Sequence, residues 1–243
     1  GSANKLYFIL TYLKENPNQQ YHGEFFGMSQ SKVSKWISLL APLLEKALFQ
    51  LKLAPKRFAN ELYVVLKNLG ELLLFMDATE RKIPRSVSDE RQKYEFSGKK
   101  KCHTIKNNLM TNDANQILYL SDSYQGSAHD KRIAQEAGLQ FPEDTYLLQD
   151  LGYVGFAPEN VTVLMPKKNY KTKPLSSYEQ EINWLIGKVR VKVEHVMAGI
   201  KRLKIVKEKI RLKSDEVRDR VMLIACALHN LRIQFRGNNI LSE

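Results

Sequence analysis

The amino-acid sequence predicts an α/β fold, in which a mixed five-stranded sheet is flanked by helices and preceded by a small all-helical domain. Residues 1–70 show only helical periodicity, residues 71–166 contain short apolar runs of strand length, and residues 167–243 return to helical periodicity. A chain of 243 residues is long enough for one large domain or for a domain together with a small module. We therefore expect a helical domain over residues 1–70 and an α/β domain over residues 71–243.

The helical domain is predicted to contain a helix-turn-helix. Helices are expected at residues 5–14, at residues 19–26, from Ser29 onward and at residues 55–69. Gly27 ends the second helix, and Ser29 is placed to cap the third. The third helix presents small polar and basic side chains on its first turns: Gln30, Ser31, Lys32, Ser34 and Lys35. This pattern is typical of a motif that reads the DNA major groove, although short helical bundles without DNA-binding activity can share it.

Five strands are predicted in the middle of the chain, and two of them lead to an aspartate. The strands are expected at residues 72–76, 100–109, 116–121, 146–149 and 161–165, with a helix at residues 129–137. The first strand ends at Asp77, and the fourth ends at Asp150, just before a sharp turn. Ligands often collect at such strand ends, because side chains there leave the core but are held by a rigid backbone.

A long amphipathic helix is predicted after a basic loop that contains lysines 167, 168, 171 and 173. Ser176 and Glu179 form its capping box, and a last helix is expected from Ser214. At about 100° per residue, Arg190, Glu194 and Lys201 project within roughly 40° of one another along one border of the long helix. An ordinary surface ion pair between Arg190 and Glu194 is the alternative interpretation.

The net charge of +12 is unevenly distributed along the chain. Residues 1–70 carry +5, residues 71–166 carry −3, residues 167–213 carry +10 and residues 214–243 carry 0. A dense positive segment usually indicates a polyanion partner, and we expect double-stranded DNA, with a solvated basic face as the alternative. The acidic middle between basic segments requires its own explanation.

Other sequence features suggest an intracellular protein. The apolar runs are far shorter than the roughly 18 residues that a membrane span needs, so we expect no membrane association. Cys102 and Cys226 lack metal-ligand spacing, and we interpret them as reduced thiols of a cytoplasmic protein. Gly1 and Ser2 resemble a cloning remnant.

Three carboxylates, Asp77, Asp150 and Glu194, are suited to a metal site. Carboxylates that converge without neutralising partners repel one another and favour a hard divalent cation with oxygen ligands, such as Mg²⁺ or Mn²⁺. Two such cations about 4 Å apart can activate a water or a 3′-hydroxyl on one side of a phosphodiester and stabilise the leaving oxygen on the other. On this interpretation, the acidic middle holds the metal and the basic segments hold DNA.

These residues resemble the motifs of DDE transposases of the insertion-sequence group related to PIF/Harbinger elements. The first motif is matched by Asp77 to Glu80, the second by Asp150 to Tyr153, and the third by Arg190, Glu194 and Lys201. Separations of 73 and 44 residues between the acids suit a core without a large insertion. Residues 126–130 also resemble a signature of the group.

The resemblance implies a ribonuclease-H-like core in which Asp77, Asp150 and Glu194 are catalytic and hold Mg²⁺, with two ions and with Mn²⁺ as a substitute. It also implies that Arg190 and Lys201 contact DNA at the cleaved end; structural ion pairing is the alternative for both. The expected substrates are terminal inverted repeats and target DNA, bound by a homodimer or larger assembly. We expect a nucleoid-associated protein of a bacterium.

Several other residues have competing interpretations. We interpret His129 and Asp130 as structural, because an aspartate in the first turn of a helix is ordinarily a cap or a dipole partner. Asp122 is the main competitor for a metal role, although its context favours a turn. We expect Trp36 and Trp184 in the core, whereas residues 99–101 could either touch phosphate or be solvated.

We therefore expect a transposase that binds the inverted repeats of its element, cleaves DNA and joins the 3′-hydroxyl to a target. A domesticated transposase that acts as a non-catalytic DNA-binding regulator or scaffold is the alternative, and a nuclease without strand transfer is a third possibility.

Overall fold

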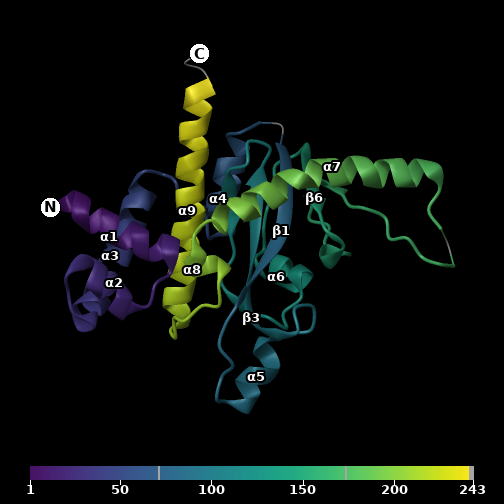
Figure 1. Ribbon diagram of the computed structural model, residues 1–243. Coiled ribbons are helices and arrows are strands. Elements are labelled where there is room, and N and C mark those ends of the chain that lie inside the picture. The colour runs from purple at the N-terminus through teal and green to yellow at the C-terminus, as the bar shows by residue number, and fades with distance from the viewer. Residues whose placement is uncertain (71, 173, 241–243) are drawn as a thin grey trace. The chain divides into compact units, whose positions relative to one another are not determined.

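The computed structural model describes residues 1–70, 72–172 and 174–240 and contains two compact units (Figure 1). The helical unit comprises Gly1–Ala54, Arg81–Ser86 and Ala198–Glu243, and the sheet unit comprises Pro55–Glu80 and Val87–Met197. These two units reflect which residues pack together. The expected division into a DNA-binding domain over residues 1–70 and a catalytic domain over residues 71–243 stays a prediction. Lys173 of the expected basic loop lies outside the described residues.

The helical unit contains the three N-terminal helices and the C-terminal part of the chain. Its helices are α1 (Ser2–Glu15), α2 (Gln19–Phe26), α3 (Gln30–Gln50), α8 (Lys204–Lys207) and α9 (Asp215–Ile240). Gly27 ends α2 with a left-handed backbone at φ 65°, as expected. Ser29 occupies the N-cap position of α3, but its side chain makes no capping hydrogen bond.

Helix α9 packs against α3 within the helical unit. Glu45 of α3 forms an ion pair with Arg220 of α9 at 2.8 Å, and Asn230 donates a hydrogen bond to the Leu53 carbonyl at 2.9 Å. Two residues that the periodicity places on inward faces are solvent-exposed: Leu6 of α1 and Phe235 of α9. Leu6 lies in the N-terminal half of α1 and Phe235 in the C-terminal half of α9. The apolar pattern of a helix can extend past the part of the helix that is packed against a neighbour.

In the part of the chain that the structure describes, the sheet unit contains the seven strands of one sheet and four α-helices. The strands are β1 (Leu72–Lys82), β2 (Phe96–Ser97), β3 (Cys102–Asn112), β4 (Ile117–Leu120), β5 (Tyr124–Gln125), β6 (Thr145–Gln149) and β7 (Val161–Leu164). The helices are α4 (Ala59–Lys67), α5 (Asp89–Glu95), α6 (Asp130–Glu136), the 3₁₀ turn η1 (Leu151–Tyr153) and α7 (Ser177–Ile200). The last residues of β1 and α7 continue into the helical unit.

The sheet is mixed, with the order β2-β3-β1-β6-β7 and with β4 and β5 paired to β3. β1 pairs with β6 in parallel and β6 with β7 in parallel, whereas β2, β4 and β5 are antiparallel to β3. All five expected strands are present, but the expected number is wrong because β2 and β5 are added. Each of these has only two residues, which is too short for a periodic signal.

The core of the sheet unit lies between β1, β6, α4 and α6. Its largest members include Leu66, Leu74, Met110, Phe141 and Tyr153, each less than a tenth exposed. Burial of such side chains contributes about 1.5–3 kcal/mol each. This core fixes the two strands that carry Asp77 and Asp150.

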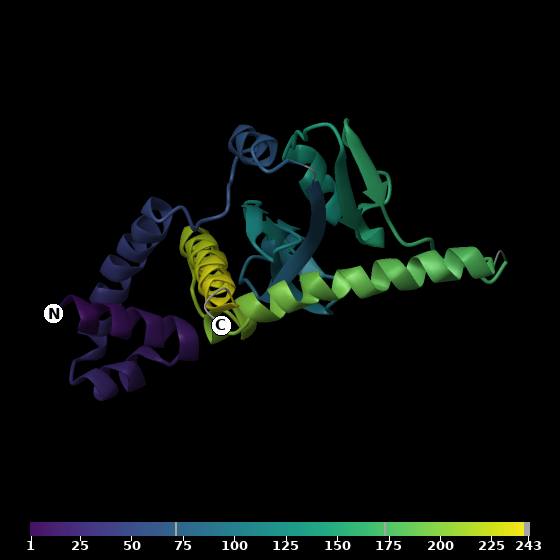
Figure 2. The ribbon, with the colours of Figure 1, turned by 90° about the horizontal axis from the view of Figure 1, so that it is seen from above.

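Helix α7 is one continuous helix, as its amphipathic pattern predicts (Figures 1 and 2). Its capping box is confirmed: Glu179 accepts from Ser176 N at 2.9 Å, and Ser176 Oγ accepts from Glu179 N at 3.3 Å. The N-terminal half of α7 extends beyond the strands of the sheet (Figures 1 and 2). No helix among the described residues is long and apolar enough to cross a membrane.

Candidate active site

Asp77 and Asp150 follow equivalent positions of two neighbouring parallel strands. Met76 of β1 lies opposite Gln149 of β6, and each aspartate is the next residue along its chain. Neighbouring strands lie about 4.8 Å apart, so the register brings together two residues that are 73 positions apart in sequence. Asp150 ends its strand as expected, whereas β1 continues past Asp77 to Lys82.

Asp77 is half-buried, and its surroundings disfavour the ionised form. Burial raises the pKa of Asp77 above its ordinary value, and the negative charges of Asp150 and Asp130 raise it further. A hydrogen bond from Ala78 N to Asp77 Oδ1 at 2.8 Å and the positive charge of Arg190 act in the opposite direction. A carboxylate in this setting gains from a nearby cation.

Asp150 is held by the turn that it begins. Its Oδ1 accepts hydrogen bonds from Leu151 N at 2.7 Å and from Arg190 Nη1 at 3.2 Å, and its carbonyl accepts from Tyr153 N at 3.0 Å. The side chains of Asp150 and Arg190 are each about one third exposed. This ion pair attaches α7 directly to the end of β6.

Glu194 lies one helical turn after Arg190 and is exposed to solvent. Residues four apart share a helix face, so Glu194 points to the side on which Arg190 contacts Asp150. Among the described residues, no group of three or more acidic, histidine or cysteine side chains is placed to hold a metal ion. The three-carboxylate site therefore stays a prediction.

Lys201 lies outside the helix in which it was expected. Helix α7 ends at Ile200, and hydrogen bonds from Arg202 N to Gly199 O and from Leu203 N to Ile200 O turn the chain there. The angular argument that grouped Lys201 with Arg190 and Glu194 on one helix border is wrong for this residue, because Lys201 begins a turn.

Asp130 is the acidic neighbour that the sequence interpretation undervalued. It lies in the first turn of α6, but its carboxylate pairs with Lys106 of β3, with 2.9 Å between Oδ1 and Nζ. Its charge also raises the pKa of Asp77 and of Tyr153. Lys106, a charged residue in the middle of a predicted strand, was the sequence feature that could have indicated a buried acidic partner. Only the fold shows that this partner is Asp130.

Tyr153 lies between the apolar core and the acidic residues. Its side chain is fully buried, and its hydroxyl has no hydrogen-bond partner among the described residues. Burial raises its pKa well above the ordinary value, and the charges of Asp130, Asp77 and Asp150 add to that effect. The buried hydroxyl of Tyr153 therefore lies within the electrostatic influence of three carboxylates.

The donor set at this edge of the sheet fits a hard divalent cation. Asp77 and Asp150 supply carboxylate oxygens from a rigid pair of strands, and no sulfur ligand is needed. Asp122, the competing acid, is exposed and pairs with Arg57 at 2.5 Å. His129 is also exposed and occupies the N-cap position of α6.

The two tryptophans differ from each other in burial. Trp36 is half-buried in α3, whereas Trp184 of α7 is 57% exposed, so its expected core position is wrong. Trp184 lies on the half of α7 that extends beyond the sheet, and Lys188 Nζ lies 3.6 Å from its ring centroid. Residues 99–101 are exposed.

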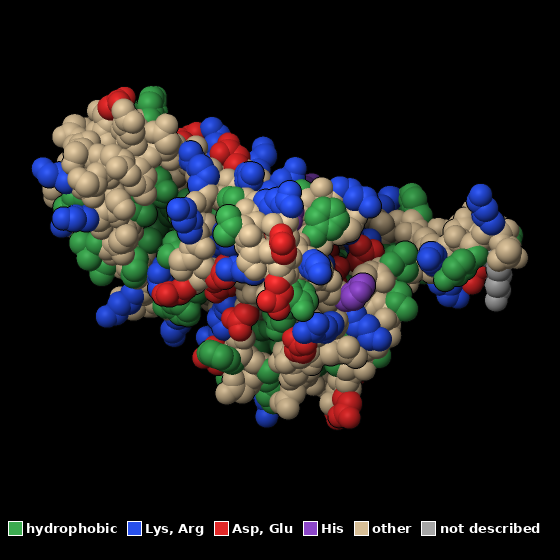
Figure 3. Space-filling model, turned by 90° about the horizontal axis from the view of Figure 1, so that it is seen from below, with side chains coloured by type: hydrophobic (Ala, Val, Ile, Leu, Met, Phe, Trp, Pro, Cys, Tyr) green, Lys and Arg blue, Asp and Glu red, His purple; other side chains and the backbone are tan. Residues whose placement is uncertain are grey.

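Helix α3 presents the side chains that the sequence places on its outer face. Gln30, Ser31, Lys32 and Lys35 are exposed, and Ser34 is half-buried. Val33 and Leu40 face inward and are buried. On the face in Figure 3, Lys and Arg side chains are spread over the surface with Asp and Glu side chains among them.

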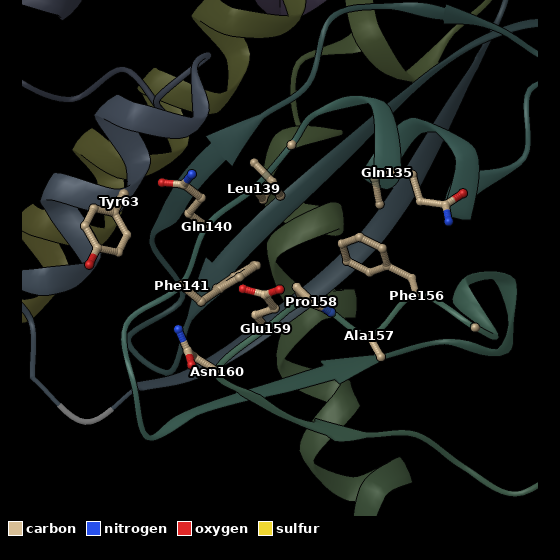
Figure 4. A pocket seen from close by; sticks show the side chains of 13 residues that line it. Tyr63, Gln135, Leu139, Gln140, Phe141, Phe156, Ala157, Pro158, Glu159 and Asn160 are labelled. Atoms are coloured by element: carbon tan, nitrogen blue, oxygen red, sulfur yellow. The ribbon is translucent and has the colours of Figure 1, made fainter.

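Two cavities of the sheet unit differ in their relation to the aspartates. One, of about 500 Å³, is lined by Tyr63, Gln140, Phe156 and Glu159 and contains none of the expected site residues (Figure 4). The other, of about 660 Å³, includes Leu151 and Val154 of the turn after Asp150. Its lining also contains lysines 167 and 168 and Tyr170, so basic and aromatic side chains adjoin the acidic edge.

Comparisons with known proteins agree with this architecture. Residues 76–230 match the family described as DDE superfamily endonuclease, and residues 1–50 match the helix-turn-helix of that superfamily. A protein of Microchaete diplosiphon named as a transposase for insertion sequence element IS702 is 27% identical over 96% of this chain and 82% of its own length. A protein of Streptomyces albus G named as a transposase for IS112 is 25% identical over 93% of this chain and 78% of its own length.

No solved structure matches the chain. The larger family match covers well over half of the sequence and includes Asp77, Asp150 and Glu194. The chain therefore belongs to the DDE superfamily endonucleases, as a transposase with an N-terminal helix-turn-helix.

Proposed function

We propose that this transposase binds the terminal inverted repeats of its own element, cleaves DNA there and joins the released 3′-hydroxyl to target DNA. The observation that supports this most is the register of β1 and β6, which sets Asp77 beside Asp150 with Arg190 in contact. The mixed sheet would then be a ribonuclease-H-like core over residues 71–243, with residues 1–70 as the recognition domain. The Asp–Asp pair is the start of the metal site, and Glu194 completes it.

Asp77, Asp150 and Glu194 would hold Mg²⁺, with Mn²⁺ as a substitute and with two ions in the working site. When bound, such ions activate the attacking oxygen and stabilise the leaving oxygen of a phosphodiester. The rigid strands orient the two aspartates, and the burial of Asp77 strengthens its attraction for a cation. Arg190 and Lys201 would contact the phosphates of the cleaved end.

DNA recognition would come from α3, whose first turns present Gln30, Ser31, Lys32, Ser34 and Lys35. The basic rim of the cavity beside Asp150 would hold the strand near the metal site. Because an element has two ends, we propose a homodimer or larger assembly on DNA. Residues 167–213 carry most of the positive charge and would form the remainder of the DNA cradle.

The test is a nicking and strand-transfer assay with Mn²⁺ on DNA that carries the repeats flanking the gene. Asp77→Ala, Asp150→Ala and Glu194→Ala should each abolish cleavage while the chain stays folded. Asp122→Ala is the matched control, because Asp122 is an exposed acid with a partner of its own. Full nicking activity in Asp150→Ala would refute the proposed site, and hydrolysed ends without joined products would indicate a nuclease without strand transfer.

A further inference from the structure

The acidic edge of the sheet contains a buried ion cluster that the proposed chemistry does not use. Lys106 Nζ lies 2.9 Å from Asp130 Oδ1, 2.8 Å from the Ala128 carbonyl and 3.7 Å from Glu80 Oε1. The side chains of Lys106 and Glu80 are each 8% exposed, and that of Asp130 is 19% exposed. Three oxygens from two segments of the chain, Glu80 of β1 and residues 128–130, thus surround one ammonium group.

Asp130 is fixed on several sides. Asn108, which is buried in β3, donates a hydrogen bond to the Asp130 carbonyl at 2.8 Å, and Lys106 holds one carboxylate oxygen. Thr104 Oγ1 donates to Glu80 Oε2 at 2.9 Å, which fixes the far side of the cluster. These contacts hold Asp130 from its backbone and from its side chain, and removing one member of a buried charge pair is costly.

The second oxygen of Asp130 packs on the turn that begins at Asp150. A methyl group added at Gly152 would lie 2.7 Å from Asp130 Oδ2, closer than such contacts normally allow. Gly152 is not among the glycines with a left-handed backbone, so an alanine here would be limited by the space beside Asp130 and not by the backbone conformation. The glycine of this turn and the aspartate of α6 therefore form one packing unit.

We propose that Asp130, held by Lys106, is a positioning residue that fixes the turn from Asp150 to Tyr153 and thereby the orientation of the Asp150 carboxylate. β6 holds the start of the turn, and buried Tyr153 holds its end. Contact of Asp130 with Gly152 fixes the middle. Asp130 acts as a support and not as a metal ligand, because its carboxylate forms an ion pair with Lys106 and its other oxygen faces Gly152. The inference rests on the proposed role of Asp150.

A double-mutant cycle between Asp130 and Gly152 tests the contact. The readouts are the dissociation constant of Mn²⁺ for the full chain without DNA, measured by calorimetry, and Mn²⁺-dependent nicking. Gly152→Ala and Asp130→Ala should each weaken Mn²⁺ binding by about tenfold or more, as changes around a metal site usually do. In the Asp130→Ala background, Gly152→Ala should change binding by less than about twofold, because the atom that it meets is gone.

A pair of isosteric variants separates a support from a ligand. Asp130→Asn keeps the shape that packs on Gly152 and leaves an oxygen beside Lys106, so Mn²⁺ binding should stay within about threefold of the wild type. Asp150→Asn should abolish binding. Glu95→Gln, which alters another buried acid paired with Arg91 at 3.0 Å, controls for lost stability and should leave Mn²⁺ binding unchanged.

Two results would overturn the inference. The first is a loss of Mn²⁺ affinity on Gly152→Ala that is as large in the Asp130→Ala background as in the wild type. That result would mean that the turn needs its glycine for another reason. The second is a loss of Mn²⁺ binding in Asp130→Asn as complete as in Asp150→Asn, which would make Asp130 a ligand. If Asp150→Ala instead binds Mn²⁺ and nicks DNA normally, the proposed function itself fails.

Discussion

Arg190 Nη1 of α7 lies 3.2 Å from Asp150 Oδ1 at the end of β6, although the two residues are 40 positions apart. The guanidinium therefore occupies space beside the carboxylate that a divalent cation would also approach. Positive charge there opposes a cation but attracts a DNA phosphate. Arg190 is thus expected to weaken the binding of a divalent cation and to strengthen the binding of DNA.

Arg190→Gln should bind Mn²⁺ more tightly and DNA ends more weakly than the wild type. A partly exposed ion pair contributes about 0.2–1 kcal/mol, so the gain in Mn²⁺ affinity should be about fivefold or less. Calorimetry without DNA and fluorescence anisotropy with end DNA measure the two effects. Arg190→Lys keeps the charge and is the control; weaker Mn²⁺ binding by Arg190→Gln would contradict this explanation.

Gly126→Ala should destabilise the sheet unit, whereas Gly187→Ala should not. An added methyl group at Gly126 would lie 2.2 Å from Thr104 Oγ1 and 2.7 Å from the Glu95 carbonyl. Overpacking of this kind costs about 1–3 kcal/mol. Gly187 of α7 has open space around it, and alanine there should gain about 0.5–1 kcal/mol. Urea denaturation compares the variants, and equal stability of the two would count against the packing described for residue 126.

The capping box of α7 should make the stability of that helix depend on pH. Hydrogen bonds from Lys167 and Ser176 lower the pKa of Glu179 to about 2 from its ordinary value of 4.5. A lowered pKa means that the stabilisation is present above pH 4.5 and is lost as the pH falls through about 2. The helical signal of the wild type should fall over this range more than that of Glu179→Gln. Glu181→Gln is the control in the same turn and should follow the wild type.

Lys32 and Lys35 should contribute to the salt dependence of DNA binding. If each contacts a phosphate, Lys32→Ala or Lys35→Ala should reduce the slope of log affinity against log salt by about one. Lys46 is exposed on the same helix but lies far from its first turns, so Lys46→Ala should leave the slope unchanged. Equal slopes in all three variants would argue against α3 as the reading helix.

Much of the fold was predictable because local chemistry and tertiary packing agree. The capping box at Ser176 and Glu179 and the left-handed glycine at the end of α2 appear as expected. Helix α5 was missed because its sequence, DERQKYE, has only Tyr94 as a large apolar side chain and therefore no apolar stripe. Trp184 was misplaced because the usual burial of tryptophan does not reveal which half of a helix has a packing partner.

The site was predictable only in part, because it depends on register between distant segments. The sequence identifies Asp77 and Asp150 as ends of apolar runs, but their alignment results from the pairing of β1 with β6. Lys106 resembles an outward-facing strand residue until α6 brings Asp130 against it. The space above Gly152 is likewise a property of the assembled turn.

The packing of α9 on α3 has a consequence for shortened copies of this gene. Arg220 and Asn230 secure α9 to the segment around α3, which carries Lys32 and Lys35. A copy with an early stop codon would lose this support, although its recognition helix would still be encoded. Such a truncated product would leave apolar surface of α3 uncovered, so we expect it to compete poorly with the intact transposase for the element ends that we propose as its substrate.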